Sequence, residues 1–142
     1  MNARSATPAP RHRRALRVLL WLLALVDAAI GGLGTIAPHA FYRHVLGVDL
    51  LGPFSEHLLS DVGGFYLGFG LLFAWAAWTL ARELVRAACA SAILTSLIHF
   101  SYHAAHLEHF TTGQVIAQTV GLAVVVVLPI LALLANRFPG SS

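Results

Sequence analysis

The chain has 142 residues, of which 58% are hydrophobic and 11% charged, and its formal net charge at pH 7 is +3. Soluble domains carry roughly 25% charged residues, so this composition cannot cover a water-facing surface and places the chain in a lipid bilayer. All nine basic residues are arginine, and no folded basic domain accompanies them, which argues against nucleic-acid binding. The single cysteine excludes an intrachain disulfide.

Residues 1–15 are polar, rich in arginine and contain proline, which is typical of a disordered basic tail. Residues 16–37 form the first apolar segment, and a transmembrane helix needs about 20 such residues. A signal peptide has the same basic-then-apolar layout. Asp27 interrupts the apolar run, however, and no small-x-small cleavage site followed by a soluble domain is evident, so we expect an uncleaved transmembrane helix. Asp27, Gly31 and Gly34 share one face of this helix, which suits close contact with a second helix.

Residues 38–55 are too interrupted by proline and glycine to span the membrane, and we expect a short interfacial helix there. Residues 54–80 form the second span, with Ser55 as the expected N-cap. One face of this span changes from polar to small residues, a pattern that typically serves helix packing. The face consists of His57, Asp61, Gly64 and Gly68.

Residues 81–86 are expected to form a charged turn, and residues 87–110 and 114–135 the third and fourth spans. Residues 136–142 make a short polar tail. Eight of the nine arginines lie at the start of the chain, in the 81–86 turn or in the C-terminal tail. Because arginine in short loops favours the cytoplasmic side, we predict a multi-pass protein of the plasma membrane with both termini in the cytoplasm.

The third span ends in four histidines between His99 and His109. An ionisable residue inside a membrane-length apolar segment is a functional-site hypothesis by default. At 100° per residue, His99, His103 and His106 fall on one helical face, with Tyr102 at its border. The cluster therefore predicts a site on one side of the third span.

All four spans carry polar residues in the half of the membrane that we expect to be outermost. An isolated charge at that depth costs about 2.5–3.5 kcal/mol on insertion scales, so these groups should face one another inside the bundle. We expect Asp61 to pair with His103 or His106, and Asp27 to pair with His99. The other members of the predicted polar chamber are Tyr102, Gln114 and Gln118.

Histidines three and four residues apart on a helix can bind one metal ion, and facing helices of a bundle often complete such sites. Imidazole with carboxylate suits Zn, Fe, Mn or Cu(II). A haem would need axial histidines on opposite sides, for example His57 against His99 or His103. The predicted metal ligands are His57, Asp61, His99, His103 and His106, with Glu56 as a further candidate.

Two other functions fit the same residues. One is a structural or accessory subunit, in which the polar network only fixes helix packing. The other is a small-molecule or proton-coupled transporter, which would need a homo-oligomer to make room for a path. No Ser-His-Asp triad and no phosphate-binding glycine loop is evident, and the sequence does not decide whether the chain is an enzyme.

The run SEHLLSDVGGF at residues 55–65, followed by the histidines of the third span, resembles small four-helix membrane proteins of unknown function that are common in actinobacteria. These proteins are similar to DoxX-like and related families of unknown function. The resemblance implies an integral protein of the cell envelope and no particular reaction. Together with the composition, it predicts an all-α, four-helix transmembrane bundle.

Overall fold

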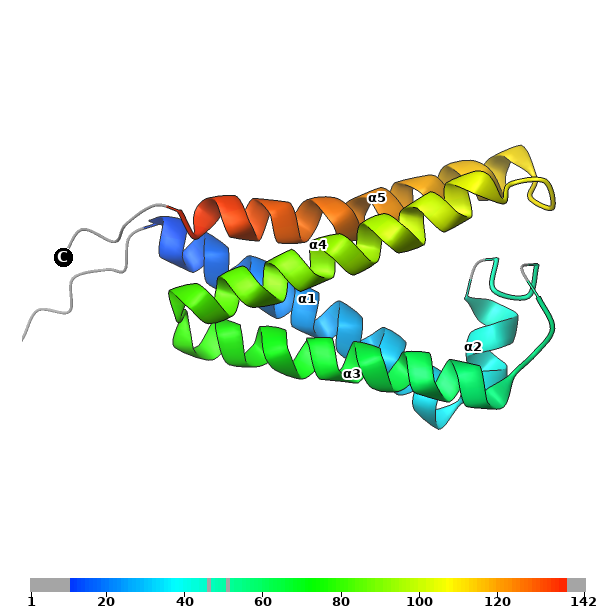
Figure 1. The fold of residues 1–142 in the computed structure, drawn as a ribbon, viewed down its shortest axis with the longest axis horizontal. Coiled ribbons are helices and arrows are strands. Elements are labelled where there is room, and N and C mark those ends of the chain that lie inside the picture. The colour runs from blue at the N-terminus through cyan, green and yellow to red at the C-terminus, as the bar shows by residue number, and fades with distance from the viewer. Residues whose placement is uncertain (1–10, 46, 51, 138–142) are drawn as a thin grey trace, which may run out of the picture.

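The computed structural model describes residues 11–45, 47–50 and 52–137, and within these ranges the chain is entirely helical apart from turns and loops (Figure 1). Four helices are long and apolar enough to cross a membrane. They are α1 (Arg11–Ile36), α3 (Glu56–Thr79), α4 (Arg82–Ala105) and α5 (Thr112–Ala135), with the short α2 (Pro38–His44) between the first two. The structure thus confirms the predicted all-α, four-helix bundle and its short helix before the second span.

The first span begins earlier than the sequence predicted. α1 starts at Arg11, so residues 11–15 are helical although we expected them in a disordered tail. Arginine has a good intrinsic helix propensity. The apolar segment that follows is already helical, so the helix can extend from it toward the N-terminus without forming a new first turn. Residues 1–10 of the expected tail, and residues 138–142 at the other end, lie outside the described residues.

Residues 82–86 of the charged stretch are helical as well, contrary to the turn that we expected at 81–86. α4 starts at Arg82, and the connection to α3 shrinks to two residues. Leu80 makes this possible by adopting a left-handed backbone conformation, with a φ of 51°, and its N–H donates to the carbonyl of Ala76 at 2.8 Å. A two-residue connection holds the adjoining ends of α3 and α4 together.

α4 ends at Ala105, five residues before the predicted end of the third span. His106 is its C-cap, with an extended φ of −129°. The next helix is set by a capping box in which Thr111 and Gln114 satisfy each other's backbone N–H groups. Because that box fixes the start of α5, residues 106–110 are needed for the reversal of chain direction and cannot continue α4.

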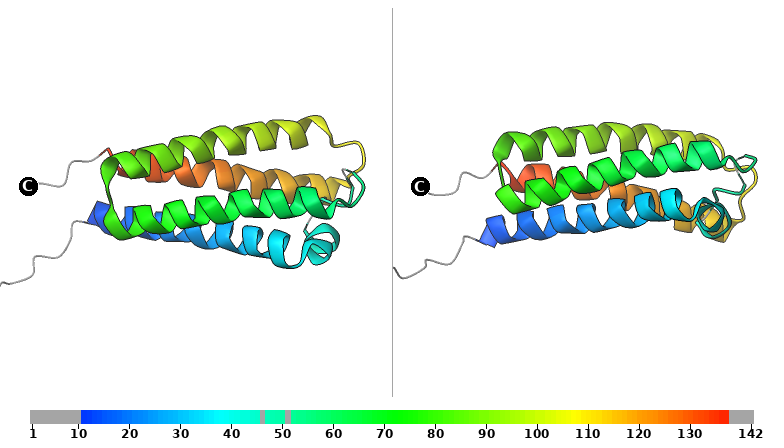
Figure 2. Two further views of the ribbon diagram at one scale, coloured as in Figure 1. Left: turned by 60° about the horizontal axis from the view of Figure 1, so that its bottom comes forward. Right: turned by 90° about the horizontal axis from the view of Figure 1, so that it is seen from below.

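The helices associate mainly as two pairs, α1 with α3 and α4 with α5. We call the end that carries the α3–α4 turn the turn end, and the end that carries α2 and the α4–α5 connection the loop end (Figure 1). The start of α1 and the end of α5 both lie at the turn end (Figures 1 and 2). In Figure 1 the two pairs come together at the turn end and diverge toward the loop end.

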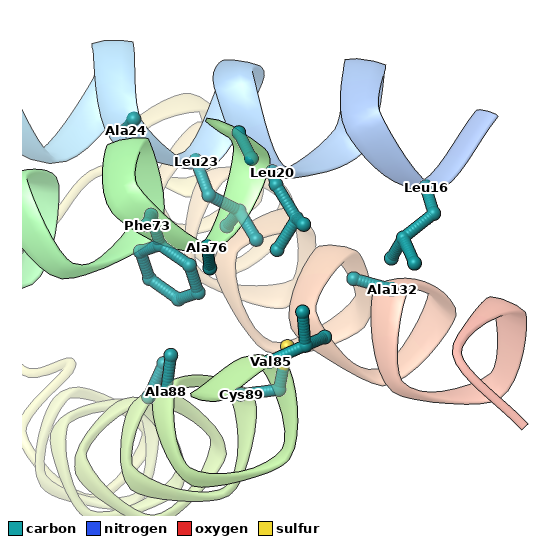
Figure 3. Close-up of a cluster of buried hydrophobic side chains, with 12 residues drawn as sticks. Leu16, Leu20, Leu23, Ala24, Phe73, Ala76, Val85, Ala88, Cys89 and Ala132 are labelled. Carbon is teal, nitrogen blue, oxygen red and sulfur yellow. The ribbon is translucent and has the colours of Figure 1, made fainter. Parts of the chain in front are cut away.

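The hydrophobic core lies in the half of the bundle next to the turn end, where all four long helices meet (Figure 3). Phe73, Leu20 and Val85 are completely buried there. Two polar contacts tie the same half together. The Arg17 guanidinium donates from Nε to the Ala77 carbonyl at 3.1 Å. The core consists of Leu16, Leu20, Leu23, Ala24, Phe73, Ala76, Ala77, Val85, Ala88, Cys89, Ala92 and Ala132.

The second contact joins the last turn of α5 to the first residue of α4. The Asn136 amide donates from Nδ2 to the Arg82 carbonyl at 3.0 Å. The turn half is therefore closed both by apolar packing and by side chains that bind backbone carbonyls of neighbouring helices.

Glycines bring α1 and α3 into backbone contact. A Cβ atom added at Gly31 would lie 2.6 Å from the Leu67 nitrogen, and one added at Gly63 would lie 2.6 Å from Thr35 Oγ1. The predicted small face of α1 is therefore its contact face. Gly64 and Gly68 do not pack against another helix of this chain, because a Cβ atom added at either position meets none of the described residues within 4 Å.

Candidate functional site

Three polar residues are buried in the described part of the chain, and each lies in the half of the bundle next to the loop end. Asp27 is 9% exposed, His103 is 8% exposed and Gln118 is 6% exposed. They come from α1, α4 and α5. Polar residues do gather in this half of the bundle, as the sequence predicts, but they divide between two places.

The first place is a pocket of about 270 Å³ between α1, α3 and α4. α4 contributes Ala92, Ser96 and His99, which share one helical face at spacings of four and three residues. Because the side chains of Ala92 and Ser96 are small, they leave space between α4 and α3. The full lining is Asp27, Val62, Phe65, Tyr66, Phe69, Ala92, Thr95, Ser96 and His99.

Asp27 is the acidic group of this pocket. Among the described residues, its carboxylate makes no ion pair and no side-chain hydrogen bond. The phenol of Tyr66 lies within electrostatic range of it. The predicted pair, Asp27 with His99, therefore shares one pocket without an ion pair or hydrogen bond between the two side chains, and His99 is partly exposed.

The hydroxyls of α4 complete the polar lining. Thr95 donates its proton from Oγ1 to the Ser91 and Ala92 carbonyls at 3.1 Å, which leaves its lone pairs free to accept. Ser96 lines the pocket without a hydrogen bond to the described residues. Sequence reasoning missed both hydroxyls, because isolated Ser and Thr on an apolar helix read as packing residues. Thr95 and Ser96 lie four and three residues before His99, and this helical spacing is the signal that could have indicated them.

The second place lies between α4 and α5. The Gln118 amide is next to the His103 imidazole, yet His103 Nδ1 and Gln118 Oε1 are buried without a hydrogen-bond partner in the described residues. The loop after α2 covers this point, since a Cβ atom added at Gly47 would lie 2.8 Å from Gln118 Oε1. Gly47 has a φ of +82°, a conformation that side chains disfavour. His103 also meets His99 edge-on, with ring centroids 4.5 Å apart.

The structure separates Asp61 and His57 from both places. His57 Nε2 lies 3.3 Å from Asp61 Oδ2 along α3, and the two side chains are 90% and 54% exposed. Asp61 thus finds its partner one turn away on its own helix. The expected pairing with His103 or His106 is not formed, because the α3 face that carries Asp61 points away from the bundle interior.

We expected His106 on the same face of α4 as His99 and His103, but the helix ends one residue before it. Its ring stacks on Tyr102 with centroids 4.2 Å apart, and its Nδ1 lies 2.8 Å from the Tyr102 carbonyl oxygen. Gln114 is used in the capping box of α5, where its Oε1 accepts from the Thr111 N–H at 2.9 Å. Neither side chain contributes to the pocket lining.

The predicted metal ligands are therefore not gathered at one point. Glu56 and the His57–Asp61 pair are exposed on α3. His99 and His103 are in ring contact on α4, and His106 stacks on Tyr102 beyond the end of that helix. Within the described ranges, no three His, Cys, Asp or Glu side chains lie close enough together to hold one ion.

Residues 15–101 match the model of DUF4345, a domain of unknown function. The chain belongs to the DUF4345 family. The match covers more than half of the chain and includes every residue that lines the pocket, whereas His103 and Gln118 lie beyond it. No curated protein and no solved structure matches this DUF4345 protein.

Proposed function

We propose that this DUF4345 protein binds a small, mainly apolar molecule with one polar end in the pocket between α1, α3 and α4. The observation that carries the proposal is the pocket itself, a space of about 270 Å³ with apolar walls and a few polar groups. Ligand sites in proteins usually have this composition, and those for drug-sized molecules measure about 300–1,000 Å³. The ligand is accordingly smaller than a typical drug.

The apolar part of the ligand fits the walls that α3 and α4 provide. Val62, Phe65 and Phe69 face the pocket from α3, and Ala92 faces it from α4. Asp27, Tyr66 and Ser96 offer the polar end its partners. A molecule of this kind dissolves in lipid, so it can reach the pocket from the bilayer as well as from water.

The charges of the chain support an orientation with the loop end facing outward. Arg13, Arg17, Arg82, Arg86 and Arg137 all belong to the turn end. Basic residues near short connections favour the cytoplasmic side. On this basis the proposed location of the protein is the plasma membrane, with the pocket in the outer half of the bilayer. The likeness to DoxX-like proteins of actinobacteria remains a prediction from the sequence.

Photoaffinity labelling tests the proposed function. The protein is reconstituted in lipid vesicles and illuminated with a short alkyl diazirine that ends in a hydroxyl group. We expect saturable labelling of the peptides that contain Phe65–Phe69 and Ala92–His99, and competition by an excess of 4-phenylbutan-1-ol. Replacing Ser96 by phenylalanine fills the pocket and should abolish the saturable labelling.

Ser101→Phe is the matched control, because Ser101 is exposed on the same helix and does not line the pocket. This variant should keep the labelling of the native protein. Labelling spread evenly over the lipid-facing helices, unaffected by competitor and by Ser96→Phe, would contradict the proposed function.

A further inference from the structure

We infer that the polar end of the ligand is a cation, so that the pocket takes an organic ammonium ion on an apolar, aromatic-sized body. The inference rests on the proposed function and adds the chemical class of the ligand. Three independent features of the lining support it: the hydrogen-bonding character of its polar groups, its charge and its aromatic side chains.

The polar groups of the lining are rich in hydrogen-bond acceptors. A carboxylate only accepts, and Asp27 has no donor bound to it among the described residues. Thr95 already donates its proton to α4 carbonyls, so toward the pocket it can only accept. Hydroxyl groups at Tyr66 and Ser96 can accept too. Among the described residues, no amide, indole, lysine or arginine lines the pocket, and an ammonium ion offers up to three N–H donors and no acceptor.

The charge of the lining points the same way. Among the described residues, Asp27 is the one carboxylate of the lining, and none of the lining side chains is permanently cationic. The other ionisable groups of the lining are Tyr66 from α3 and His99 from α4, and neither carries a permanent charge. An unpaired carboxylate inside a membrane is costly, and a ligand cation removes that cost at the moment of binding. An anionic ligand would increase it.

Aromatic rings supply the third feature. Phe65, Tyr66 and Phe69 line the α3 side of the pocket. The face of an aromatic ring attracts a cation placed within about 6 Å, and this attraction is stronger where water is excluded. Carboxylate and aromatic side chains therefore act together on one ammonium group, while the apolar walls hold the rest of the ligand.

Competition between matched ligands tests the inference in the reconstituted native protein. 4-Phenylbutylamine, its quaternary trimethylammonium analogue and 4-phenylbutan-1-ol share one body and differ in charge. Membrane-bound concentrations are compared, so that partitioning into lipid cancels. We expect the amine to displace the diazirine probe at about a tenfold lower concentration than the alcohol, as when a charged contact replaces a neutral one. The trimethylammonium analogue has no N–H group, so it should keep only the part of this preference that comes from charge and aromatic contacts and lie between the amine and the alcohol.

The Asp27→Asn variant should reduce this preference to less than about twofold, while leaving displacement by the alcohol unchanged, which also shows that the variant is folded. Asp61→Asn is the matched control, because Asp61 is an acid of α3 outside the pocket, and it should keep the native preference. Equal displacement by cations and alcohol would overturn the cation and leave the pocket intact. If no competitor displaced the probe, the proposed function itself would fail.

Discussion

The two halves of the bundle are built from the same four helices but differ in how closely those helices pack. Next to the turn end, a two-residue connection and a series of alanines let all four helices meet, and Phe73 fills the space between them. Next to the loop end, the α4–α5 pair diverges from the α1–α3 pair (Figure 1). The buried side chains in that half include Asp27, His103 and Gln118. The comparison teaches that the first half supplies stability, and that the second half gives up packing to leave an apolar pocket with a few polar groups.

Two phenylalanines of α3 should show the largest difference between the halves. Phe73 is completely buried in the turn half, whereas Phe65 is 73% exposed in the loop half. Replacing Phe73 by alanine should lower the free energy of unfolding by about 3–5 kcal/mol, since it leaves a cavity in the core. Phe65→Ala should change it by less than about 1 kcal/mol, because no cavity forms. Unfolding by SDS in mixed micelles measures both, and similar losses would break the comparison.

Adjacent glycines of α3 should differ less, but in a way that identifies the contact face. Gly63→Ala places a Cβ atom 2.8 Å from the Thr35 nitrogen, so α1 and α3 must separate. We expect a loss of about 1–3 kcal/mol, the usual cost of overpacking. Gly64→Ala meets nothing within 4 Å, and it should be neutral or stabilising because alanine favours the helix. If Gly64→Ala were the more damaging change, α3 would face α1 with its other side.

A third comparison uses the two glutamines of α5 and should give the smallest effects. Gln114→Leu removes half of the capping box and should cost about 1 kcal/mol. Gln118→Leu removes a buried carbonyl that lacks a hydrogen bond in the described residues, so it should be neutral or stabilise by up to about 1 kcal/mol. Thermal unfolding in detergent separates the two. A larger loss for Gln118→Leu would mean that its oxygen has a buried partner, such as a bound water.

Much of the fold could be predicted because it depends on the lengths of the apolar runs and on the positions of polar residues within them, and both can be read from one sequence. The length of each apolar run sets the spans, and the depth of Asp27 and Gln118 along those runs places them in the same half of the bundle. Helix ends were harder to predict. Arg11 and Arg82 extend α1 and α4 because arginine is a good helix former. His106 falls outside α4 because the capping box of α5 fixes the next helix start.

The sequence indicates which half of the bundle holds the buried polar residues, but it does not indicate which side chains line the pocket. Spacing along α3 groups Asp61 with Gly64 and Gly68, but it does not say which face of the helix meets α1, and Gly63 offers an alternative contact one residue away. Asp61 also has a local partner in His57, which removes the energetic need to reach α4. Thr95 and Ser96 were missed because the space beside them depends on how far α3 and α4 diverge. The sequence of one helix does not determine that separation.

Thiol labelling at Ser96 tests most directly whether the pocket between α1, α3 and α4 is open and reached by polar molecules. Maleimides react with the thiolate, which forms only where water or polar groups reach the sulfur. The native Cys89 is completely buried and serves as the blank. Leu94→Cys places a thiol on the lipid-exposed face of the same helix, 61% exposed and outside the pocket. We expect N-ethylmaleimide to label Ser96→Cys in vesicles, 4-phenylbutylamine to slow that labelling, and Leu94→Cys to stay unlabelled. A Ser96→Cys variant as unreactive as the native protein would contradict the pocket.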